Sequence, residues 1–406
     1  MANLLFLVHR LPYPPNKGDK IRSFHLLERL SSRHQVHLGT FVDDPDDLAH
    51  VERVRERCAS LHVARLTPWR ARWRSLGGLL SGRPLTLGYY RDAGLHAWVA
   101  ETKRTQSIDA VIVFSSSMAP YAEPGPTLPT LVDFIDMDSL KWAQYADTRR
   151  WPLSWLFRRE GRLLLDYERR IAAHSLRSFF VTERETALFR ERAPESAARA
   201  EPMGNGVDAS YFAPDPRLAS PYAGDELPLV FTGSMDYWPN ADAVSWFAAE
   251  VLPRVRAQWP RARLHIVGRN PSSAVRALAA DDVVVSGTVP DVRPYLQHAA
   301  VVVAPLRLAR GIQNKVLEAM AMARPVVATR ECAQAIDARE GDELCVADDA
   351  EGFVAAIDRL LREPAHALAV GAAARRRVVG DYKWASHLSV LDRHLDTKQS
   401  ALAIPS

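Results

Sequence analysis

The sequence is poor in the features that mark secreted, membrane-spanning and disulfide-stabilised proteins. It has only three cysteines, Cys58, Cys332 and Cys345, and they lie far apart with no C-x-x-C spacing. This excludes a disulfide framework and a zinc knuckle, and it favours a reducing compartment. No apolar run is long enough to cross a bilayer, and residues 1–8 lack the basic start and long apolar stretch of a secretory signal. We therefore expect a cytoplasmic protein.

Strong charge and metal-binding patterns are also missing. The 52 basic and 48 acidic residues leave a net charge of only +4, and the dispersed arginines form no nucleic-acid-binding motif. The 13 histidines show no metal-ligand spacing, and no Ser–His–Asp order or nucleophile elbow occurs. We therefore expect no nucleic-acid partner, no metal or other cofactor, and no covalent nucleophile.

The sequence does contain a repeated alternation of short apolar runs and amphipathic stretches. Runs predicted as buried strands occupy residues 4–8, 36–41, 61–66, 110–114, 130–134, 178–182, 229–233, 264–268, 283–287, 301–305 and 326–329. Stretches predicted as helices separate them, including residues 20–33, 241–258 and 312–323. Strands that alternate with helices indicate parallel sheets covered on both faces. The predicted fold class is therefore α/β, with doubly wound sheets.

Length and composition divide the chain into parts. A chain of 406 residues is too long for one typical hydrophobic core. Residues 201–228 are dense in proline and glycine, which favours an extended connection between domains. We predict a first α/β domain over residues 1–200, a linker over 201–228 and a second α/β domain over 229–380. A C-terminal helix over 381–406 could pack back on the first domain.

The strongest candidate site is the segment 301–329, in which a strand is followed by a polar loop, a helix and a second strand. Ligands of open parallel sheets bind beyond the carboxyl ends of the strands, and a helix start there offers unpaired N–H groups to a diphosphate. Gly311 lets a ligand approach the backbone, and Lys315 adds charge in the first turn. Glu318, one turn on, can accept hydrogen bonds from two ribose hydroxyls. The alternative is a capped structural helix with a solvated lysine and glutamate.

This segment resembles the signature of the retaining glycosyltransferases called group 1, or family four: a Glu, seven residues, a second Glu, then Ala-x-Ala-x-Gly-x-Pro-Val-Val. Glu318 matches the second Glu, which binds the ribose in that family, whereas Arg310 replaces the first Glu and Ala323 the Gly. Three further segments resemble the family in order and spacing, at residues 205–212, 264–268 and 285–291. The resemblance implies the GT-B architecture, two Rossmann-like domains facing a central cleft. The first would be the acceptor-side domain, and the second would bind a nucleoside diphosphate sugar.

The resemblance also implies a donor site. In the family the turn after residues 229–232 carries an arginine and then a lysine, and both are missing here. We expect Lys315, with Arg269 or Arg310, to replace these charges beside the phosphates, and we expect retention at the anomeric carbon. The implied donor-binding residues are Gly18, Gly233, Ser234, Val289, Arg310, Gly311, Ile312, Gln313, Asn314 and Glu318. The candidate catalytic residues are Lys315, Asp136 and Arg269.

The loop after the first strand is a second candidate site. Gly18 allows a ligand close to the backbone. Positive charge nearby comes from Lys17, Lys20 and Arg22. In the family a glycine-rich loop here faces the donor diphosphate, although this chain has one glycine where a pair is usual. The alternative is an ordinary strand–helix turn with solvated lysines.

An acidic loop follows the strand predicted at residues 130–134. Asp136 and Asp138 form an Asp-x-Asp pair, which binds a divalent metal in glycosyltransferases of a different fold. Because the surroundings match the GT-B pattern, we expect no metal here. Two interpretations remain: a polar role for Asp136 beside the acceptor, or capping of the next helix through Asp136 or Ser139.

Four segments resemble a narrower group, the exopolysaccharide sugar transferases associated with exosortase (PEP-CTERM) systems: residues 15–22, 82–86, 133–139 and 231–240. This resemblance implies a hexosyltransferase-type enzyme of bacterial envelope or exopolysaccharide synthesis, with a saccharide or lipid-linked acceptor. Two other functions remain open. A GT-B sugar-nucleotide epimerase would need no acceptor, and a non-catalytic sugar-nucleotide-binding protein would show no turnover.

Two stretches mix arginine with tryptophan, at residues 68–80 and 148–165. The first places Trp69 and Trp73 on one helical face, and the second contains Trp151. Helices of this kind either pack on the protein core or lie on an anionic membrane. We expect packing on the core. A peripheral contact with the inner face of the plasma membrane is the alternative, because many polysaccharide acceptors are lipid-linked.

Overall fold

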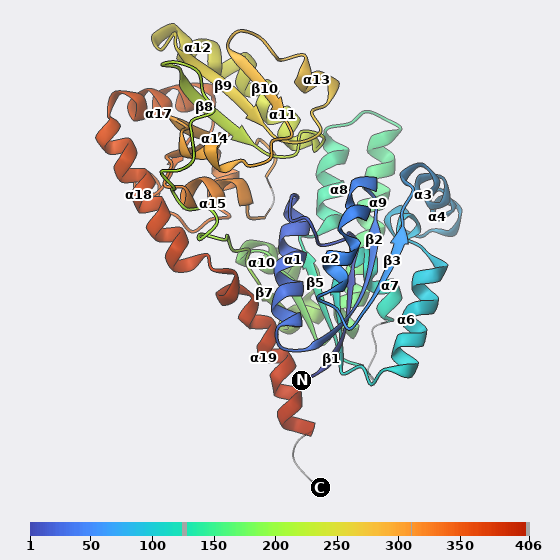
Figure 1. Ribbon diagram of the computed structural model, residues 1–406. Helices are drawn as coiled ribbons and strands as arrows, with labels where there is room; N and C mark the ends of the chain where they lie inside the picture. Colours follow the sequence, from blue (N-terminus) through green and yellow to red (C-terminus); the bar gives the residue numbers. More distant parts are fainter. Residues whose placement is uncertain (124–127, 310, 403–406) are drawn as a thin grey trace. The chain divides into compact units, whose positions relative to one another are not determined.

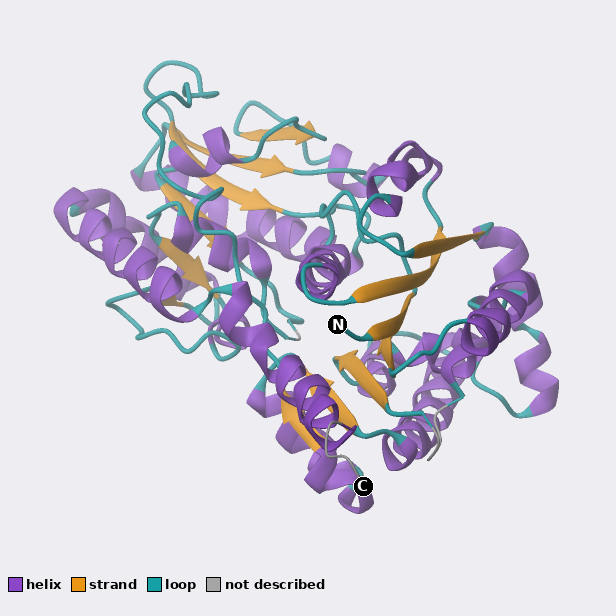
Figure 2. Ribbon diagram, turned by 60° about the horizontal axis from the view of Figure 1, so that its bottom comes forward, coloured by secondary structure: helices purple, strands orange, loops and turns teal. Residues whose placement is uncertain are grey.

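The chain forms two compact units, each with its own hydrophobic core (Figure 1). The computed structural model describes residues 1–123, 128–309 and 311–402, with side chains through residue 396. The first unit comprises residues 1–204 together with the C-terminal helix from Leu388, and the second comprises Asn205–His387. In each unit helices pack around a parallel sheet (Figure 2), so the predicted α/β class is confirmed. Among the described helices, none is both long enough and apolar enough to cross a membrane.

The sheet of the first unit has seven strands in the order β3-β2-β1-β4-β5-β6-β7. Their bounds are β1 (Asn3–Val8), β2 (Gln35–Val42), β3 (Ser60–Arg65), β4 (Ala110–Phe114), β5 (Thr130–Ile135), β6 (Arg177–Phe180) and β7 (Ala200–Pro202). Every neighbouring pair is parallel. The central strands β1 and β4 consist largely of aliphatic and phenylalanine side chains because both of their faces are buried.

Helices surround this sheet, and the end of the chain is attached to them by ion pairs. The α-helices of the first unit are α1 (Gly18–Ser31), α2 (Val51–Arg55), α3 (Pro68–Ser75), α4 (Gly77–Ser81), α5 (Leu85–Tyr89), α6 (Ala93–Thr105), α7 (Ala119–Ala122), α8 (Asp138–Asp147), α9 (Leu153–His174) and α10 (Glu183–Arg192). The last helix, α19 (Trp384–Leu402), joins them from Leu388 onward. Asp392 on α19 accepts hydrogen bonds from Arg29, with Nε 3.0 Å from Oδ2, and from Arg33. His394 Nε2 on the same helix lies 3.0 Å from Glu201 Oε2.

The sheet of the second unit has six parallel strands in the order β10-β9-β8-β11-β12-β13. Their bounds are β8 (Leu227–Thr232), β9 (Ala262–Val267), β10 (Val283–Gly287), β11 (Val301–Ala304), β12 (Val326–Ala328) and β13 (Cys345–Val346). The order reverses between β8 and β11. Open parallel sheets bind ligands at such a reversal, beyond the carboxyl ends of the strands.

The helices of the second unit differ from the prediction at one place. They are α11 (Trp238–Trp246), α12 (Leu252–Gln258), α13 (Ser273–Arg276), α14 (Arg293–Gln297), α15 (Asn314–Ala321), α16 (Arg330–Ala333), α17 (Ala350–Arg362) and α18 (Pro364–Asp381). The single helix predicted over residues 241–258 is instead α11 and α12, joined by a π-helical turn at Phe247–Val251. Pro253 lies in the first turn of α12, and because it has no N–H it cannot continue the hydrogen-bond ladder of α11.

Candidate functional site

Three adjacent strands of the second unit end beside one another in glycines. Gly233 follows β8 with φ 154°, Gly268 follows β9 with φ 152°, and Gly287 ends β10. A Cβ atom on Gly268 would lie 1.7 Å from the carbonyl oxygen of Gly233, so no other residue fits there. The Gly233 N–H donates to Val267 (3.0 Å), and the Gly268 N–H donates to Gly287 (3.1 Å). At the carboxyl ends of these strands, the backbones therefore pack closely against one another and form one edge of the sheet.

Lys315 reaches this edge from α15. Its Nζ donates to Asn240 Oδ1 at 2.6 Å, and Asn240 Nδ2 donates to the Ser234 carbonyl at 2.8 Å. The ammonium also lies 4.1 Å from the centre of the Phe231 ring. A Cβ atom added to Gly233 would lie 3.0 Å from Lys315 Nζ. Burial lowers the pKa of Lys315 to about 8. The charge of Lys315 therefore lies at the turn after β8, where the two expected family charges are missing.

The start of α15 is open. Gln313 is the N-cap residue, but its side chain makes no capping hydrogen bond, and the first N–H groups of a helix have no acceptor within the helix. Asn314 Oδ1 accepts from Asn205 Nδ2 at 3.1 Å. Asn314 Nδ2 is buried without an acceptor among the described residues. Gly311 and Ile312 lead into this start, whereas the predicted Arg310 lies outside the described residues. The helix start thus presents several donors together with its dipole.

Glu318 lies one turn further along α15 and is half-buried. Burial raises its pKa to about 7, although the Lys315 ammonium opposes the shift. No hydrogen bond to its carboxylate occurs among the residues that the structure describes. The carboxylate is therefore available to accept hydrogen bonds from a ligand. The alternative of a capped helix with a solvated lysine does not fit, because the cap is absent and the Lys315 ammonium is withdrawn from solvent.

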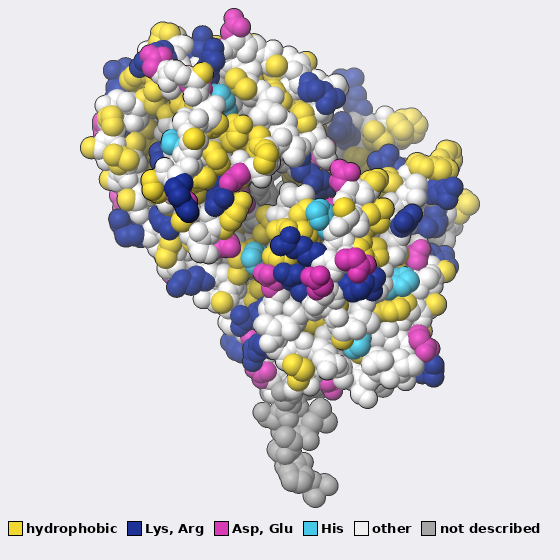
Figure 3. Space-filling model, in the orientation of Figure 1, with side chains coloured by type: hydrophobic (Ala, Val, Ile, Leu, Met, Phe, Trp, Pro, Cys, Tyr) yellow, Lys and Arg dark blue, Asp and Glu magenta, His cyan; other side chains and the backbone are white. Residues whose placement is uncertain are grey.

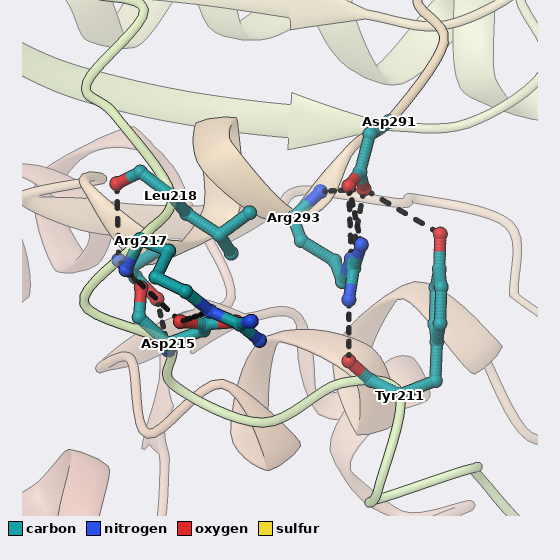
Figure 4. Close-up of polar contacts among 7 residues, drawn as sticks. Tyr211, Asp215, Arg217, Leu218, Asp291 and Arg293 are labelled. Atoms are coloured by element: carbon teal, nitrogen blue, oxygen red, sulfur yellow. Dashed lines mark hydrogen bonds and ion pairs between the residues drawn. The ribbon is translucent and has the colours of Figure 1, made fainter.

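A polar cluster of Tyr211, Asp291 and Arg293 was not predicted as part of the site (Figure 4). Burial, with the charges of Asp291 and Glu318, raises the pKa of Tyr211. The Arg293 guanidinium lies 4.1 Å from the centre of the Tyr211 ring and binds Asp291 Oδ2 through Nε at 2.9 Å and Nη2 at 2.7 Å. These contacts hold the loop after β10, in which the predicted Val289 packs partly against the core. Tyr211 and Asp291 lie in the segments 205–212 and 285–291, which resemble the family in sequence. This resemblance is the signal by which they could have been identified.

The other predicted residues of the second unit lie at the same strand ends. Ser234 follows Gly233, and its hydroxyl donates to Asp236 Oδ1 at 2.5 Å. Arg269 follows Gly268 directly, its carbonyl accepts from the Met235 N–H at 2.9 Å, and its side chain is half-buried. The structure thus brings Ser234, Arg269 and Lys315 to one edge of the second sheet.

In the first unit, two of the charges predicted to surround Gly18 have other partners. Gly18 is the exposed first residue of α1. Lys20 Nζ donates to Asp47 Oδ1 at 2.8 Å, and both side chains are buried. Arg22 donates from Nε and Nη2 to the two oxygens of Asp133 at 2.7 and 3.0 Å. The expectation that Lys20 and Arg22 add charge for a ligand is wrong, because each is neutralised inside the fold.

Asp136 lies half-buried in the turn between β5 and α8, and its N–H donates to Phe134 (2.8 Å). The N-cap residue of α8 is Met137, which makes no side-chain capping hydrogen bond, and the Ser139 hydroxyl does not bind the helix start. Instead Glu168 of α9 accepts from the Ser139 N–H at 3.1 Å and from the Ser139 hydroxyl at 2.5 Å. Burial raises the pKa of Glu168 to about 8. No group of three metal-ligating side chains occurs in the described part of the chain.

His9, which directly follows β1, was not among the predicted site residues. Its Nε2 lies 3.1 Å from Asp19 Oδ2, and its ring stacks on Phe114 with ring centres 5.7 Å apart. The ring is buried, and its Nδ1 has no partner among the described residues. A polar side chain directly after a predicted strand was the signal that could have identified it.

Comparisons with known proteins agree with this arrangement. Residues 226–363 match the model of a family described as Glycosyl transferases group 1. No curated protein sequence matches the chain at a significant level.

Solved structures match nearly the whole chain. Sucrose-phosphate synthase from Thermosynechococcus elongatus has a TM-score of 0.73 and 18% identity, with 99% of this chain and 100% of that chain covered. HepE from Anabaena, in complex with UDP-glucose, has a TM-score of 0.69 and 14% identity, with 98% and 100% covered. WaaG, a glycosyltransferase involved in lipopolysaccharide biosynthesis, has a TM-score of 0.66 and 16% identity, with 96% and 98% covered. The chain thus has the fold of the GT-B glycosyltransferases, and its residues 226–363 are similar to the group 1 glycosyltransferase family.

Proposed function

We propose that this protein transfers a sugar from a nucleoside diphosphate sugar to a saccharide or lipid-linked acceptor. The observation that carries the proposal is the position of Lys315, held by Asn240 at the strand edge beside the uncapped start of α15. An ammonium, the first N–H groups of a helix and the helix dipole together suit a diphosphate. Glu318, without a hydrogen-bond donor among the described residues, suits the ribose hydroxyls.

The chemical difficulty in sugar transfer is departure of the diphosphate as the anomeric bond breaks. Negative charge grows on the leaving oxygen, and preorganised donors that face this charge stabilise the transition state. In our proposal Lys315 and the first N–H groups of α15 supply these donors, with Arg269 or Arg310 adding charge. Asn240 keeps the ammonium oriented through its 2.6 Å hydrogen bond. These groups make a metal unnecessary in the proposal.

The proposed stereochemical outcome is retention at the anomeric carbon. The support is the match of Glu318 and the following residues to the signature of retaining enzymes. The acceptor hydroxyl attacks the anomeric carbon as the bond to the diphosphate breaks, and its proton passes to the departing phosphate. No enzyme base is then required, and Asp136 is assigned a polar role beside the acceptor.

Uridine diphosphate sugars are the first donors to test. HepE structures contain UDP and UDP-glucose, and this relative shares the fold. The four segments that resemble exosortase-associated transferases support a role in exopolysaccharide or cell-envelope polysaccharide synthesis. All three cysteines are free, which supports a cytoplasmic site of action.

The test measures nucleotide release from UDP-, GDP- and ADP-hexoses, with and without saccharide and polyprenyl-linked acceptors. Release that depends on an acceptor, with a product whose anomeric configuration by NMR matches the donor, supports the proposal. Nucleotide release that needs no acceptor would indicate an epimerase or a hydrolase. Donor binding by calorimetry without turnover across the panel would indicate a non-catalytic sugar-nucleotide-binding protein.

A further inference from the structure

Large hydrophobic side chains are exposed in one part of the first unit far more than elsewhere. Eight of the fifteen exposed large hydrophobic side chains among the described residues lie on two segments: Trp69, Trp73, Leu76, Leu79, Leu80, Trp151, Leu153 and Trp155. We call these eight residues the tryptophan surface. Figure 3 shows hydrophobic side chains with lysine or arginine beside them over α3 and α4 and over the turn between α8 and α9. The expectation that these helices bury their tryptophans on the core is wrong.

The exposure is large enough to require an explanation. Trp69 and Trp73 lie one turn apart on α3 and are 60% and 71% exposed, whereas Ala71 and Ser75 on the other face of α3 are buried. Leu80, at the end of α4, is 96% exposed. Trp151 is 80% exposed. Contiguous exposed apolar side chains of this size mark an interaction surface.

The two segments are fastened to each other. Arg159 on α9 donates from Nη2 to the Gly78 carbonyl at 2.7 Å. The next residue, Glu160, is buried and accepts from the N–H groups of Leu85 at 2.8 Å and Thr86 at 2.9 Å. Trp155 lies one turn before Arg159 on the same face of α9. The α3–α4 segment and the start of α9 therefore present their tryptophans as one rigid surface.

The charge around the tryptophan surface is predominantly positive. Residues 57–91 contain no Asp or Glu. Exposed arginines surround the tryptophans, and they are Arg70, Arg72, Arg74, Arg83, Arg149, Arg150 and Arg158. Of these, Arg158 pairs with Asp147 at 3.7 Å. A second copy of the chain would bring the same arginines face to face across a twofold axis, which disfavours self-association.

We propose that the tryptophan surface binds an anionic lipid bilayer. Tryptophan rings are amphipathic and concentrate at the interface between lipid and water, and arginines beside them are attracted to anionic headgroups. Leu80 would insert among the acyl chains, and the arginines would lie at the level of the phosphates. The inference needs no turnover, so it stands or fails separately from the proposed transferase activity.

The test is co-sedimentation of the full-length protein with vesicles of phosphatidylcholine alone or mixed with phosphatidylglycerol. We expect binding to the mixed vesicles only, with a blue shift of tryptophan fluorescence, and release at high salt. The variants W69S/W73S and W151S/W155S should each lower the partition coefficient about tenfold or more, because they remove buried apolar area. R70Q/R72Q should lower it about fivefold for each arginine.

A matched control is Leu368→Ser, which removes another exposed hydrophobic side chain, on α18 of the second unit. This control should bind vesicles as the unchanged protein does, and all variants should keep their melting temperature and their activity on a soluble acceptor. Absence of binding to anionic vesicles, or equal binding by W69S/W73S, would overturn the proposal. A concentration-dependent dimer that W69S/W73S abolishes would also overturn it, and would assign the surface to a second copy.

Discussion

Two strand–helix turns, one in each unit, carry similar residues but use their charge differently. The turn after β1 precedes α1, which contains Lys20 and Arg22, and the turn after β11 precedes α15, which contains Lys315. In α1 the cations meet carboxylates, with Lys20 bound to Asp47 and Arg22 to Asp133. In α15 the Lys315 ammonium meets the amide oxygen of Asn240 and the face of Phe231.

The partner decides which of these charges can act on a ligand. A cation that is paired with a carboxylate inside the fold contributes little net charge to its surroundings, and separating the pair is costly. A cation held by neutral groups keeps its full charge. A lysine or arginine near a strand end is therefore a binding candidate only if the fold provides no carboxylate for it.

The largest effect should come from breaking the buried pair of the first unit. Arg22→Ala leaves the Asp133 carboxylate buried, and we expect a loss of about 3–5 kcal/mol in the free energy of unfolding. Denaturant unfolding followed by tryptophan fluorescence measures it. The double variant R22M/D133L removes both charges and should recover most of the loss. A loss below about 1 kcal/mol for Arg22→Ala would mean that the pair behaves like a surface pair.

The second effect concerns catalysis rather than stability. Lys315→Ala should lower kcat about 100-fold to 1000-fold, as removal of one transition-state donor does in other enzymes. Its melting temperature should change little, since Asn240 loses only one hydrogen bond. Lys383→Ala, at an exposed lysine, is the matched control. Near-normal turnover by Lys315→Ala would remove this residue from the mechanism.

Donor binding should depend on pH in a bell-shaped manner. Below about pH 7 the Glu318 carboxyl gains a proton and loses an acceptor, because its pKa is raised to about 7. Above about pH 8 Lys315 loses its charge, because its pKa is lowered to about 8. Calorimetry with UDP-glucose tests this, since the phosphates of that donor do not titrate in this range. Glu318→Gln should remove the acid limb and Lys315→Arg the alkaline limb; unchanged limbs would contradict the assignment.

The smallest effect concerns how the unfolding free energy depends on pH, to which the buried Glu168 contributes. Burial raises the folded-state pKa of Glu168 to about 8 from an ordinary value of 4.5. Between these values the folded protein retains a proton that the unfolded chain releases, so the stability contribution falls as pH rises through this window. Glu168→Gln should flatten the curve of unfolding free energy against pH. Parallel curves for the two proteins would refute the raised pKa.

The sheet strands were the most predictable part of the fold. Runs such as those of β1, β4 and β11 are buried on both faces, and composition alone reveals them. The strands β7 (Ala200–Pro202) and β13 (Cys345–Val346) were missed, because edge strands of two or three residues carry too few side chains for a pattern. The break between α11 and α12 was missed although Pro253 was visible in the sequence.

The candidate site was partly predictable. Glu318, Lys315 and the strand-end glycines could be identified because their spacing follows the chain locally. The contact between Tyr211 and Arg293 could not be predicted, because it joins residues that are 82 positions apart.

The sequence by itself determined the alternation of strands and helices and the residues available at each strand end, since both depend on local spacing and on burial of apolar runs. Only the tertiary structure decided which cations were neutralised and which tryptophans stayed exposed. Arg22 finds Asp133 from 111 positions away, and Trp69 and Trp155 share one rigid surface because Arg159 and Glu160 bind the backbone near α4. Electrostatic pairing and exposure are properties of distance in space, and spacing along a chain does not encode them.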